Sequence, residues 1–218
     1  MKRALAALAA TGCLATAFAQ DVTADEAPSA DLWAQERARE DAGDFDGAIH
    51  ACMQILRRHP KEPRAMNAIA GLNGKLGRYR DEITWASRAI HVDRGFFEAQ
   101  INLGTAEAAL GNEAAARKAF QRARDLAPSS PMPVYSLGVL AERRHDVPTA
   151  TALYERAVAL DPTFESGWFN LAAMQAQAGR FDDALASLDK VLALHPDAQD
   201  AQAMRRHVQA DKAAAAGR

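Results

Sequence analysis

The feature that most constrains the fold is a recurring pattern with a 34-residue period. Within residues 100–128, an apolar run that ends in Leu103 and Gly104 is broken at Gly111, and an alanine-rich second run stops at Pro128. The skeleton returns one period later and again after a second period, with these residues: Leu137, Gly138, Tyr154, Pro162, Leu171, Ala172, Leu188 and Pro196. Each period therefore holds two short helical patterns separated by a turn. The sequence predicts an all-α array of helix pairs.

Five such periods follow one another without insertion, and together they cover residues 29–198. We predict repeats at 29–62, 63–96, 97–130, 131–164 and 165–198. Residues 199–218 continue a helical pattern that becomes polar, as expected for a capping helix with one face in water, and residues 213–218 are expected to fray. The fourth repeat has no glycine at its break, and we expect its Pro148 in the first turn of the second helix.

The first two repeats depart from this pattern at further positions. Glu36 and Arg39 make the first helix of the first repeat irregular, and at the place of Glu36 the later repeats have only alanine or glycine. In the second repeat, Glu82 stands where the other repeats have alanine, and Arg94 replaces the closing proline. Terminal repeats are often atypical, since one of their faces meets water. The helix contact near Glu82 is left open by the sequence.

The register resembles the tetratricopeptide repeat over 170 of the 218 residues. The fifth repeat matches the family pattern closely, through Trp168, Leu171, Ala172, Gly179, Phe181, Ala184 and Pro196. The resemblance implies antiparallel helix pairs stacked into an α-solenoid, a right-handed superhelix whose first helices line a concave groove. It also implies that the protein binds other proteins or peptides and is not an enzyme.

The N-terminal residues have the pattern of a signal peptide. Lys2 and Arg3 precede an apolar run, and residues 17–19, Ala-Phe-Ala, fit a cleavage site after Ala19. This predicts a bacterial protein that is periplasmic or secreted, with an acidic, flexible leader over residues 20–28. An alternative is a lipoprotein anchored through Cys13, because residues 10–13 loosely resemble a lipobox. No later apolar stretch approaches the ~20 residues of a membrane-spanning helix, so none is expected in the mature chain.

Charge and cysteine content narrow the functional class. The formal net charge is −2, and the sequence has no block of like charge, so a nucleic-acid partner is not expected. If Cys13 leaves with the signal peptide, Cys52 remains alone and no intramolecular disulfide can form. Cys52 occupies an interior helix position in the repeat register, and we expect it to be a buried small apolar residue.

No constellation of residues predicts a catalytic, metal or cofactor site. No two of the six histidines have the i, i+3 or i+4 spacing of a metal clip on a helix. The glycines of residues 71–77 lack the spacing of a phosphate-binding loop and are better explained as part of a turn between helices. No Gly-x-Ser-x-Gly sequence is present.

On the first helix of each repeat, one stripe of residues is more apolar than expected for a helix that buries a single face. It consists of the fifth, ninth and twelfth residues of each repeat, about 100° around the helix from the packing stripe. The last three repeats place there Ile101, Thr105, Ala108, Tyr135, Val139, Glu142, Phe169, Ala173 and Ala176, whereas the first two place Trp33, Arg37, Glu40, Asn67, Gly71 and Gly74. By resemblance to the family these positions face the groove, whose C-terminal half would be apolar. The alternative is that the aromatic side chains fill space between adjacent helices.

The predicted peptide-binding site combines this stripe with two asparagines. Family members often use an asparagine at the position of Asn102 and Asn170 to hold a peptide backbone, although capping of a local turn is an equal alternative. The predicted site consists of Ile101, Asn102, Thr105, Tyr135, Val139, Phe169, Asn170 and Ala173. The basic residues of the family's clamp for a C-terminal carboxylate are missing. An apolar or amphipathic helix is therefore the favoured partner.

These observations predict a non-catalytic, periplasmic protein–protein interaction adaptor in a cell-envelope assembly, with no cofactor. The alternative is a self-associating structural oligomer, with Trp33 as the anchor of a homo-oligomer, or an outer-membrane lipoprotein scaffold.

Overall fold

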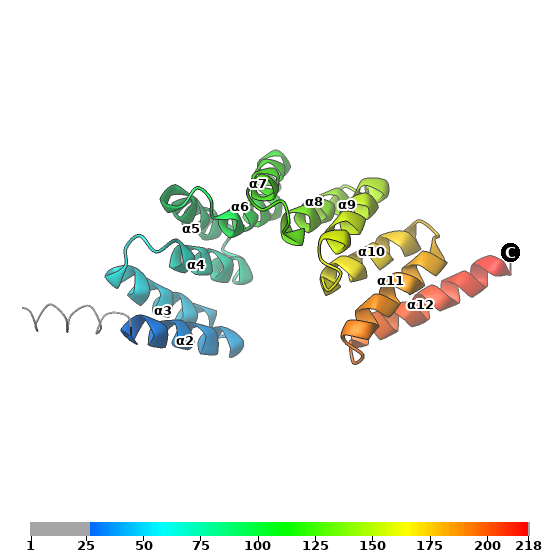
Figure 1. The fold of residues 1–218 in the computed structure, drawn as a ribbon, viewed down its shortest axis with the longest axis horizontal. Helices are drawn as coiled ribbons and strands as arrows, with labels where there is room; N and C mark the ends of the chain where they lie inside the picture. Colours follow the sequence, from blue (N-terminus) through cyan, green and yellow to red (C-terminus); the bar gives the residue numbers. More distant parts are fainter. Residues whose placement is uncertain (1–26, 218) are drawn as a thin grey trace, which may run out of the picture. The chain divides into compact units, whose positions relative to one another are not determined.

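The computed structural model describes residues 27–217, which form eleven α-helices and no β-strand. The chain divides into two compact units, at residues 92 and 93 (Figure 1). The first unit contains α2 (Ala27–Asp41), α3 (Phe45–Arg58), α4 (Pro63–Lys75) and α5 (Tyr79–Val92). The second contains α6 (Phe97–Ala109), α7 (Glu113–Leu126), α8 (Pro131–Arg143), α9 (Val147–Leu160), α10 (Glu165–Gln177), α11 (Phe181–Leu194) and α12 (Gln199–Ala216).

The helices recur with the period of the sequence. The even-numbered helices α4 to α12 begin at residues 63, 97, 131, 165 and 199, which are 34 residues apart. The odd-numbered helices α3 to α11 begin at residues 45, 79, 113, 147 and 181, with the same spacing. Turns of three residues join the two helices of each pair into an antiparallel hairpin. The all-α fold class, with five helix pairs and a C-terminal helix, is thus confirmed for the described residues.

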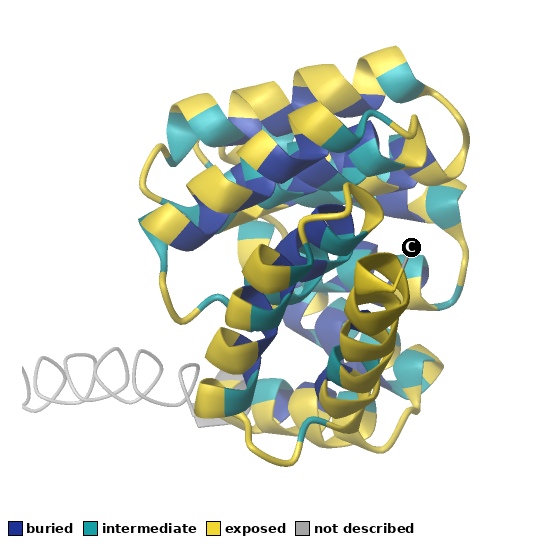
Figure 2. Cartoon of the chain, turned by 90° about the vertical axis from the view of Figure 1, so that its right-hand side faces the viewer, coloured by how far each residue is buried: buried dark blue, intermediate teal, exposed yellow. Residues whose placement is uncertain are grey.

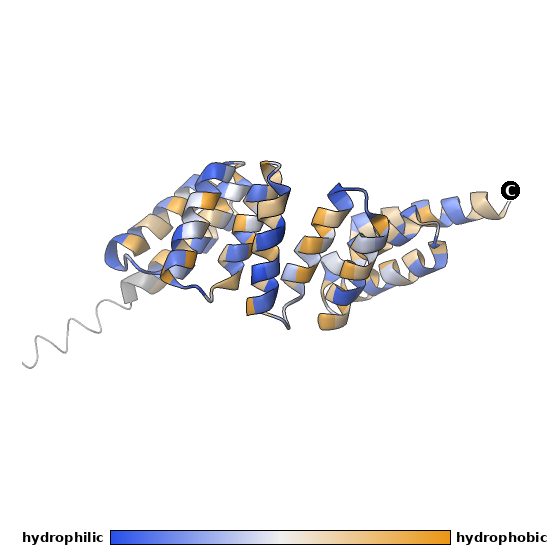
Figure 3. Ribbon diagram, turned by 90° about the horizontal axis from the view of Figure 1, so that it is seen from above, coloured by the Kyte–Doolittle hydropathy of each residue, from blue (hydrophilic) through white to orange (hydrophobic). Residues whose placement is uncertain are grey.

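Each helix buries one face, because small and apolar residues recur on that face at helical spacing. Hydrophobic and hydrophilic residues share each helix in Figure 3. In α11, for example, Ala184, Leu188 and Val191 are buried, whereas Asp182 and Asp183 in its first turn are exposed. Proline begins α4 and α8, and Pro148 lies in the first turn of α9, as expected. No hydrogen bond is lost there, since the first turn has free N–H groups.

The turns inside the helix pairs require a left-handed residue. Gly111 and Gly179 have φ angles of 83° and 73°, and Gly43 and Gly77 are similar. In the fourth pair this place is taken by His145, with a φ of 57°. A side chain is strained in this region because its Cβ crowds the backbone, and glycine has no Cβ.

Replacing His145 by glycine is expected to raise the free energy of unfolding by about 1 kcal/mol, since the strain at φ 57° is removed. Urea unfolding followed by circular dichroism measures the change. The reverse substitution, Gly179→His in the turn before α11, is expected to lower stability by a similar amount. Equal stability of all three proteins would contradict this explanation of the turn.

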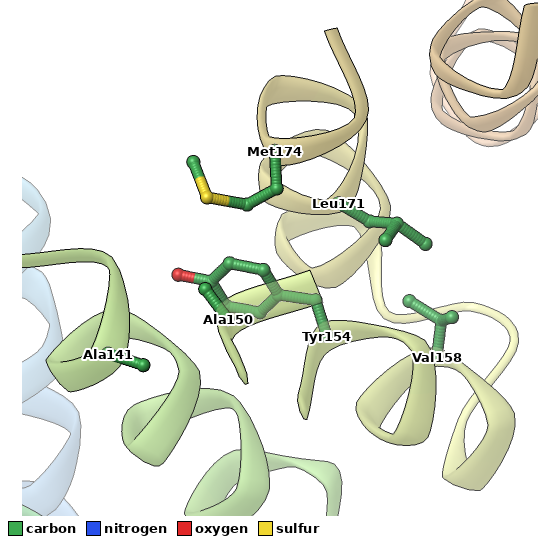
Figure 4. Packing of buried hydrophobic residues seen from close by; sticks show 6 residues of the cluster. All are labelled: Ala141, Ala150, Tyr154, Val158, Leu171 and Met174. Carbon is green, nitrogen blue, oxygen red and sulfur yellow. The ribbon is translucent and has the colours of Figure 1, made fainter. Parts of the chain in front are cut away.

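Glycines also let aromatic side chains enter the helix contacts of the second unit. A Cβ added to Gly138 on α8 would lie 2.6 Å from Cε1 of Tyr154 on α9. A Cβ added to Gly104 on α6 would likewise collide with the ring of Phe120 on α7. Tyr154 is fully buried and belongs to a cluster with Leu171 and others, shown in Figure 4. The missing side chain on one helix therefore provides the volume for the large one on the other.

In the described part of the first unit, no aromatic side chain is fully buried. Cys52 is fully buried, as predicted, and burial raises the pKa of its thiol to about 12. Glu36 is also buried, and burial together with the neighbouring Glu40 raises its pKa. Trp33 packs against the core, and the guanidinium of Arg64 lies 4.7 Å from the centre of its ring. Much of the ring predicted to anchor a homo-oligomer is therefore covered within its own unit.

The two ends of the array differ from the prediction. Helix α2 begins at Ala27, inside the segment predicted as leader. Helix α12 runs to Ala216 through residues predicted to fray, because the run of four alanines before Gly217 is a strong helix former. The predicted signal peptide, the alternative lipidation site at Cys13 and residues 20–26 of the predicted leader lie outside the described residues. None of the helices in the described part is both long and apolar enough to cross a lipid bilayer.

Candidate functional site

The eight residues of the predicted peptide-binding site lie on three helices of the second unit. Ile101, Asn102 and Thr105 are on α6, Tyr135 and Val139 are on α8, and Phe169, Asn170 and Ala173 are on α10. Thr105 is exposed, and the other seven are half-buried. We call these eight residues the first-helix stripe: they are six residues of the apolar stripe in the sequence pattern together with Asn102 and Asn170. Because none of them is fully buried, each keeps some surface that a partner could contact.

Tyr135 is held by two aromatic neighbours. The ring of Phe164 meets it edge-on, with centroids 5.1 Å apart and an angle of 89° between the planes. The ring of Tyr154 lies on α9, the partner helix of the hairpin. Its centroid is 5.5 Å from that of Tyr135, and the two ring planes are tilted by 42°. Val139 and Ala173 pack against the same cluster as Tyr135. The structure therefore brings Tyr135, Val139 and Ala173 together around the core of α8, α9 and α10.

Four polar side chains form a hydrogen-bonded network at this cluster. The Asn170 amide donates to the hydroxyl oxygen of Tyr135 at 3.1 Å and to that of Tyr154 at 3.4 Å. The Tyr154 hydroxyl in turn donates to Oε2 of Glu142 at 2.5 Å. Figure 4 shows this hydroxyl at the end of the ring away from Val158. Burial and the bond to Glu142 raise the pKa of Tyr154, and burial with the Glu142 charge raises that of Tyr135. Both phenols are therefore neutral over the physiological range, and that of Tyr154 acts as a donor to Glu142.

The remaining apolar residues of the stripe join two other clusters. Ile101 packs against the cluster that contains Phe120 and Leu140. Phe169 packs against the cluster of α10, α11 and α12, which contains Leu188 and Val208. The stripe is therefore part of three hydrophobic clusters rather than one. Its aromatic side chains serve in part as packing between helices, which was the alternative explanation from the sequence.

Sequence reasoning missed three members of this region. Tyr154 and Phe164 belong to the second helix and to the loop before α10, so they lie outside the first-helix stripe. Glu142 was within the stripe pattern but was not among the predicted site residues. Phe120 and Tyr154 each follow a glycine of the preceding helix at the same interval, and this recurrence is a signal that could have located the Tyr154 ring.

The second unit also has two hollows that lie outside the stripe. The hollow between α6 and α7 has a volume of about 610 Å³ and is lined by Gln100, Leu103, Glu107, Ala115, Lys118, Ala119, Gln121, Arg122 and Asp125. The hollow between α11 and α12 has a volume of about 400 Å³ and is lined by Leu192, Pro196, Gln202, Arg205, Arg206 and Gln209. Neither contains a residue of the first-helix stripe. In the described part of the chain, no group of three His, Cys, Asp or Glu residues could hold a metal ion.

Models of tetratricopeptide repeats match most of the chain. One matches residues 34–95 and 86–131, and another matches residues 137–209. Cellulose synthase operon protein C of Pseudomonas fluorescens (strain SBW25) is 29% identical over 159 residues. The alignment covers 72% of this chain but only 10% of that protein, so the chain spans about a tenth of the relative's length.

Solved structures of tetratricopeptide repeat proteins share the fold. The thermophilic protein TTC0263 of Thermus thermophilus is 20% identical, with a TM-score of 0.74 over 83% of this chain and 98% of that one. YrrB, described as having an unusual peptide-binding site, is 18% identical, with a TM-score of 0.54 over 75% of this chain and 84% of that one. The regular spacing of the helices agrees with the matched models. This chain belongs to the tetratricopeptide repeat family.

Proposed function

We propose that the protein is a non-catalytic interaction adaptor of the bacterial periplasm, and that its first-helix stripe binds an apolar or amphipathic helix of a cell-envelope protein. The observation that carries the proposal is the partial exposure of the stripe. Its apolar members recur on α6, α8 and α10, and each of them keeps accessible surface instead of being buried. Partly exposed apolar surface of this kind is typical of binding sites.

The family and the N-terminal pattern support the two parts of this proposal. The tetratricopeptide repeat fold supports a role in protein–protein interaction, and YrrB is a structural neighbour named for a peptide-binding site. The signal-like pattern of residues 1–19 supports export. A relative named for a cellulose synthase operon is in keeping with a role at the cell envelope.

The amide–phenol network supports a defined contact surface on α8 and α10. The Asn170 amide donates to the hydroxyls of the half-buried Tyr135 and the fully buried Tyr154, so the Tyr135 ring is held in place before any partner arrives. A fixed aromatic surface loses little side-chain entropy on binding. The asparagine predicted to hold a peptide backbone thus has an internal role as well. We infer that the surface binds chiefly through apolar contact.

The test is affinity capture from an envelope extract of the source bacterium, with the full chain and a stripe variant as bait. The variant carries Thr105→Arg and Phe169→Gln, which place a charge and an amide on the stripe while sparing Tyr135 and its network. We expect a protein that the parent chain captures to be lost from the variant. The physical reason is that the introduced polar groups lose water on contact with an apolar partner.

The matched control carries the same two new residues at positions of second helices outside the stripe, Ala152→Arg on α9 and Ala186→Gln on α11. This control is expected to capture the same partner as the parent chain. Circular dichroism must first show that both variants have the helix content of the parent. Undiminished capture by a folded stripe variant would contradict the proposed site, and the stripe would then serve only as packing.

A further inference from the structure

A carboxyl group lies inside the helix contact of the first unit. Glu82 on α5 is only 2% exposed and is among the largest fully buried side chains. The second helices of the other four pairs have a fully buried alanine at the equivalent position of the repeat: Ala48, Ala116, Ala150 and Ala184. Among the described pairs, α4–α5 is therefore the only one with an ionisable group at this position of the second helix.

The facing helix provides the space for this side chain. A Cβ added to Gly74 on α4 would lie 2.6 Å from Oε2 of Glu82, 2.8 Å from Cδ and 2.9 Å from Oε1. The carboxyl group therefore lies directly against the Gly74 backbone. At the position of Gly74, α6 and α10 have Ala108 and Ala176. In those two hairpins alanine faces alanine, whereas in α4–α5 glycine faces glutamate.

No described basic group or hydrogen-bond donor is placed to stabilise a negative charge on Oε2 of Glu82. Its Oε2 atom is buried and has no hydrogen-bond partner among the described residues. The basic side chains of the helices packed around it are engaged elsewhere or lie at the surface. Lys75 donates to Glu40, Arg78 to Asp46, and the guanidinium groups of Arg64 and Arg88 lie over Trp33 and Trp85. The other charged residues and histidines of α3, α4 and α5 are exposed: His50, Arg57, Arg58, Arg80, Asp81 and His91.

We propose that Glu82 makes the α4–α5 hairpin a pH-responsive segment: the helix contact holds the carboxyl in its protonated form, and loss of the proton loosens α5 from α4. An ionised carboxylate without a partner is unfavourable in this position, because it has lost its water and gained no compensating bond. The same burial raises the pKa of Glu82 to about 7. No charged neighbour contributes to this shift.

The direction of the pH dependence follows from this shift. The ordinary pKa of a glutamate in the unfolded chain is 4.5, so between pH 4.5 and about 7 the folded state binds more protons than the unfolded state. The stabilising contribution of Glu82 is therefore complete below about pH 4.5, and it is lost as the pH rises from there through the folded-state pKa of about 7. Between pH 5 and pH 8 the folding equilibrium constant of the first unit is expected to fall roughly 70-fold through Glu82 alone.

The experiment compares the full chain with its Glu82→Gln variant, which keeps the side-chain shape and removes the titration. Urea unfolding between pH 5 and pH 8.5 gives the stability, and hydrogen exchange with mass spectrometry follows α4 and α5 separately from α8–α11. We expect exchange in α4 and α5 to accelerate with pH in the parent, beyond the intrinsic chemical rate, and not in the variant. The helices of the second unit serve as the internal reference. Parallel pH profiles for parent and variant would overturn the proposal.

A second pair of variants covers the case in which Glu82→Gln does not fold. Gly74→Ala alone is expected to destabilise the hairpin, since its methyl group meets the Glu82 carboxyl. Gly74→Ala combined with Glu82→Ala recreates the alanine pair of α6–α7 and α10–α11. The double variant is expected to be as stable as the parent at pH 5, to exceed it at pH 8, and to lack the pH-dependent exchange in α4 and α5. A double variant that keeps the parent's pH dependence would assign that dependence to other groups.

Discussion

Replacing Tyr154 by alanine is expected to lower the free energy of unfolding of the second unit by about 4 kcal/mol. The side chain is fully buried, and its ring contacts the cluster that contains Ala150, Leu171 and Met174 (Figure 4). The facing residue is Gly138, which has no side chain that could move into the cavity. Urea unfolding measures the loss, and hydrogen exchange should locate it in α8, α9 and α10.

The control for this prediction is Tyr154→Phe, which keeps the ring and removes the hydroxyl. It deletes the bond to Glu142 and one of the two bonds from Asn170, and it is expected to cost about 2 kcal/mol. The difference between the two variants then isolates the packing of the ring. If alanine and phenylalanine were equally destabilising, the hydrogen-bonded network rather than the ring would carry the stability of this hairpin.

Removing α12 by truncation after Ala198 is expected to destabilise the second unit by at least about 3 kcal/mol. Val208 and Ala201 on this helix are 1% exposed and belong to one cluster with Leu188 and Val191 of α11. Burial of a valine side chain alone contributes about 1.5–3 kcal/mol, and the truncation also exposes its neighbours to water. Thermal unfolding by circular dichroism measures the loss, and light scattering should show aggregation through the exposed face of α11.

The control is a truncation after Lys212, which removes only the last, exposed turn of α12. Figure 2 shows the exposed residues along the helix that ends at the C mark. This truncation keeps Lys212, which pairs with Asp182 of α11, and Arg205, whose Nε lies 3.1 Å from Oδ1 of Asp189. The shorter truncation should therefore leave the melting temperature nearly unchanged. A comparable loss from both truncations would mean that residues 213–218, rather than the apolar face around Val208, stabilise the second unit.

The arrangement of the helices could be predicted from the sequence because the relevant signals are local. Gly111 and Gly179 mark turns that need a left-handed residue, and Pro148 marks the first turn of a helix. Each acts within a few residues of its position, so the period of the sequence gives the helix pairs directly. His145 could not be recognised as a left-handed residue in isolation. Only its register with the glycines of the other pairs indicates that role.

The candidate site was harder to predict, because depth of burial depends on the facing helix. The sequence placed Tyr135 and Phe169 on one stripe, but their packing depends on Phe164 and Tyr154 in one case and on α11 and α12 in the other. Glu82 is the clearest example. The sequence marks it as a departure from alanine, yet its burial requires the absence of a side chain at Gly74, which lies on another helix.

The pairing of a glycine on one helix with a large side chain on the next has a consequence for how arrays of this kind diverge. In α6–α7 and α8–α9 the glycine faces an aromatic ring, and in α4–α5 a glycine at another position of the repeat faces the Glu82 carboxyl. A larger side chain at one of these glycines would collide with the ring or the carboxyl group, so it calls for a smaller residue on the partner helix. Each matched pair lies within one hairpin, so the hairpin is the unit in which these side-chain volumes are matched. Recombination that exchanges whole hairpins preserves these volumes, whereas exchange of a single helix breaks them.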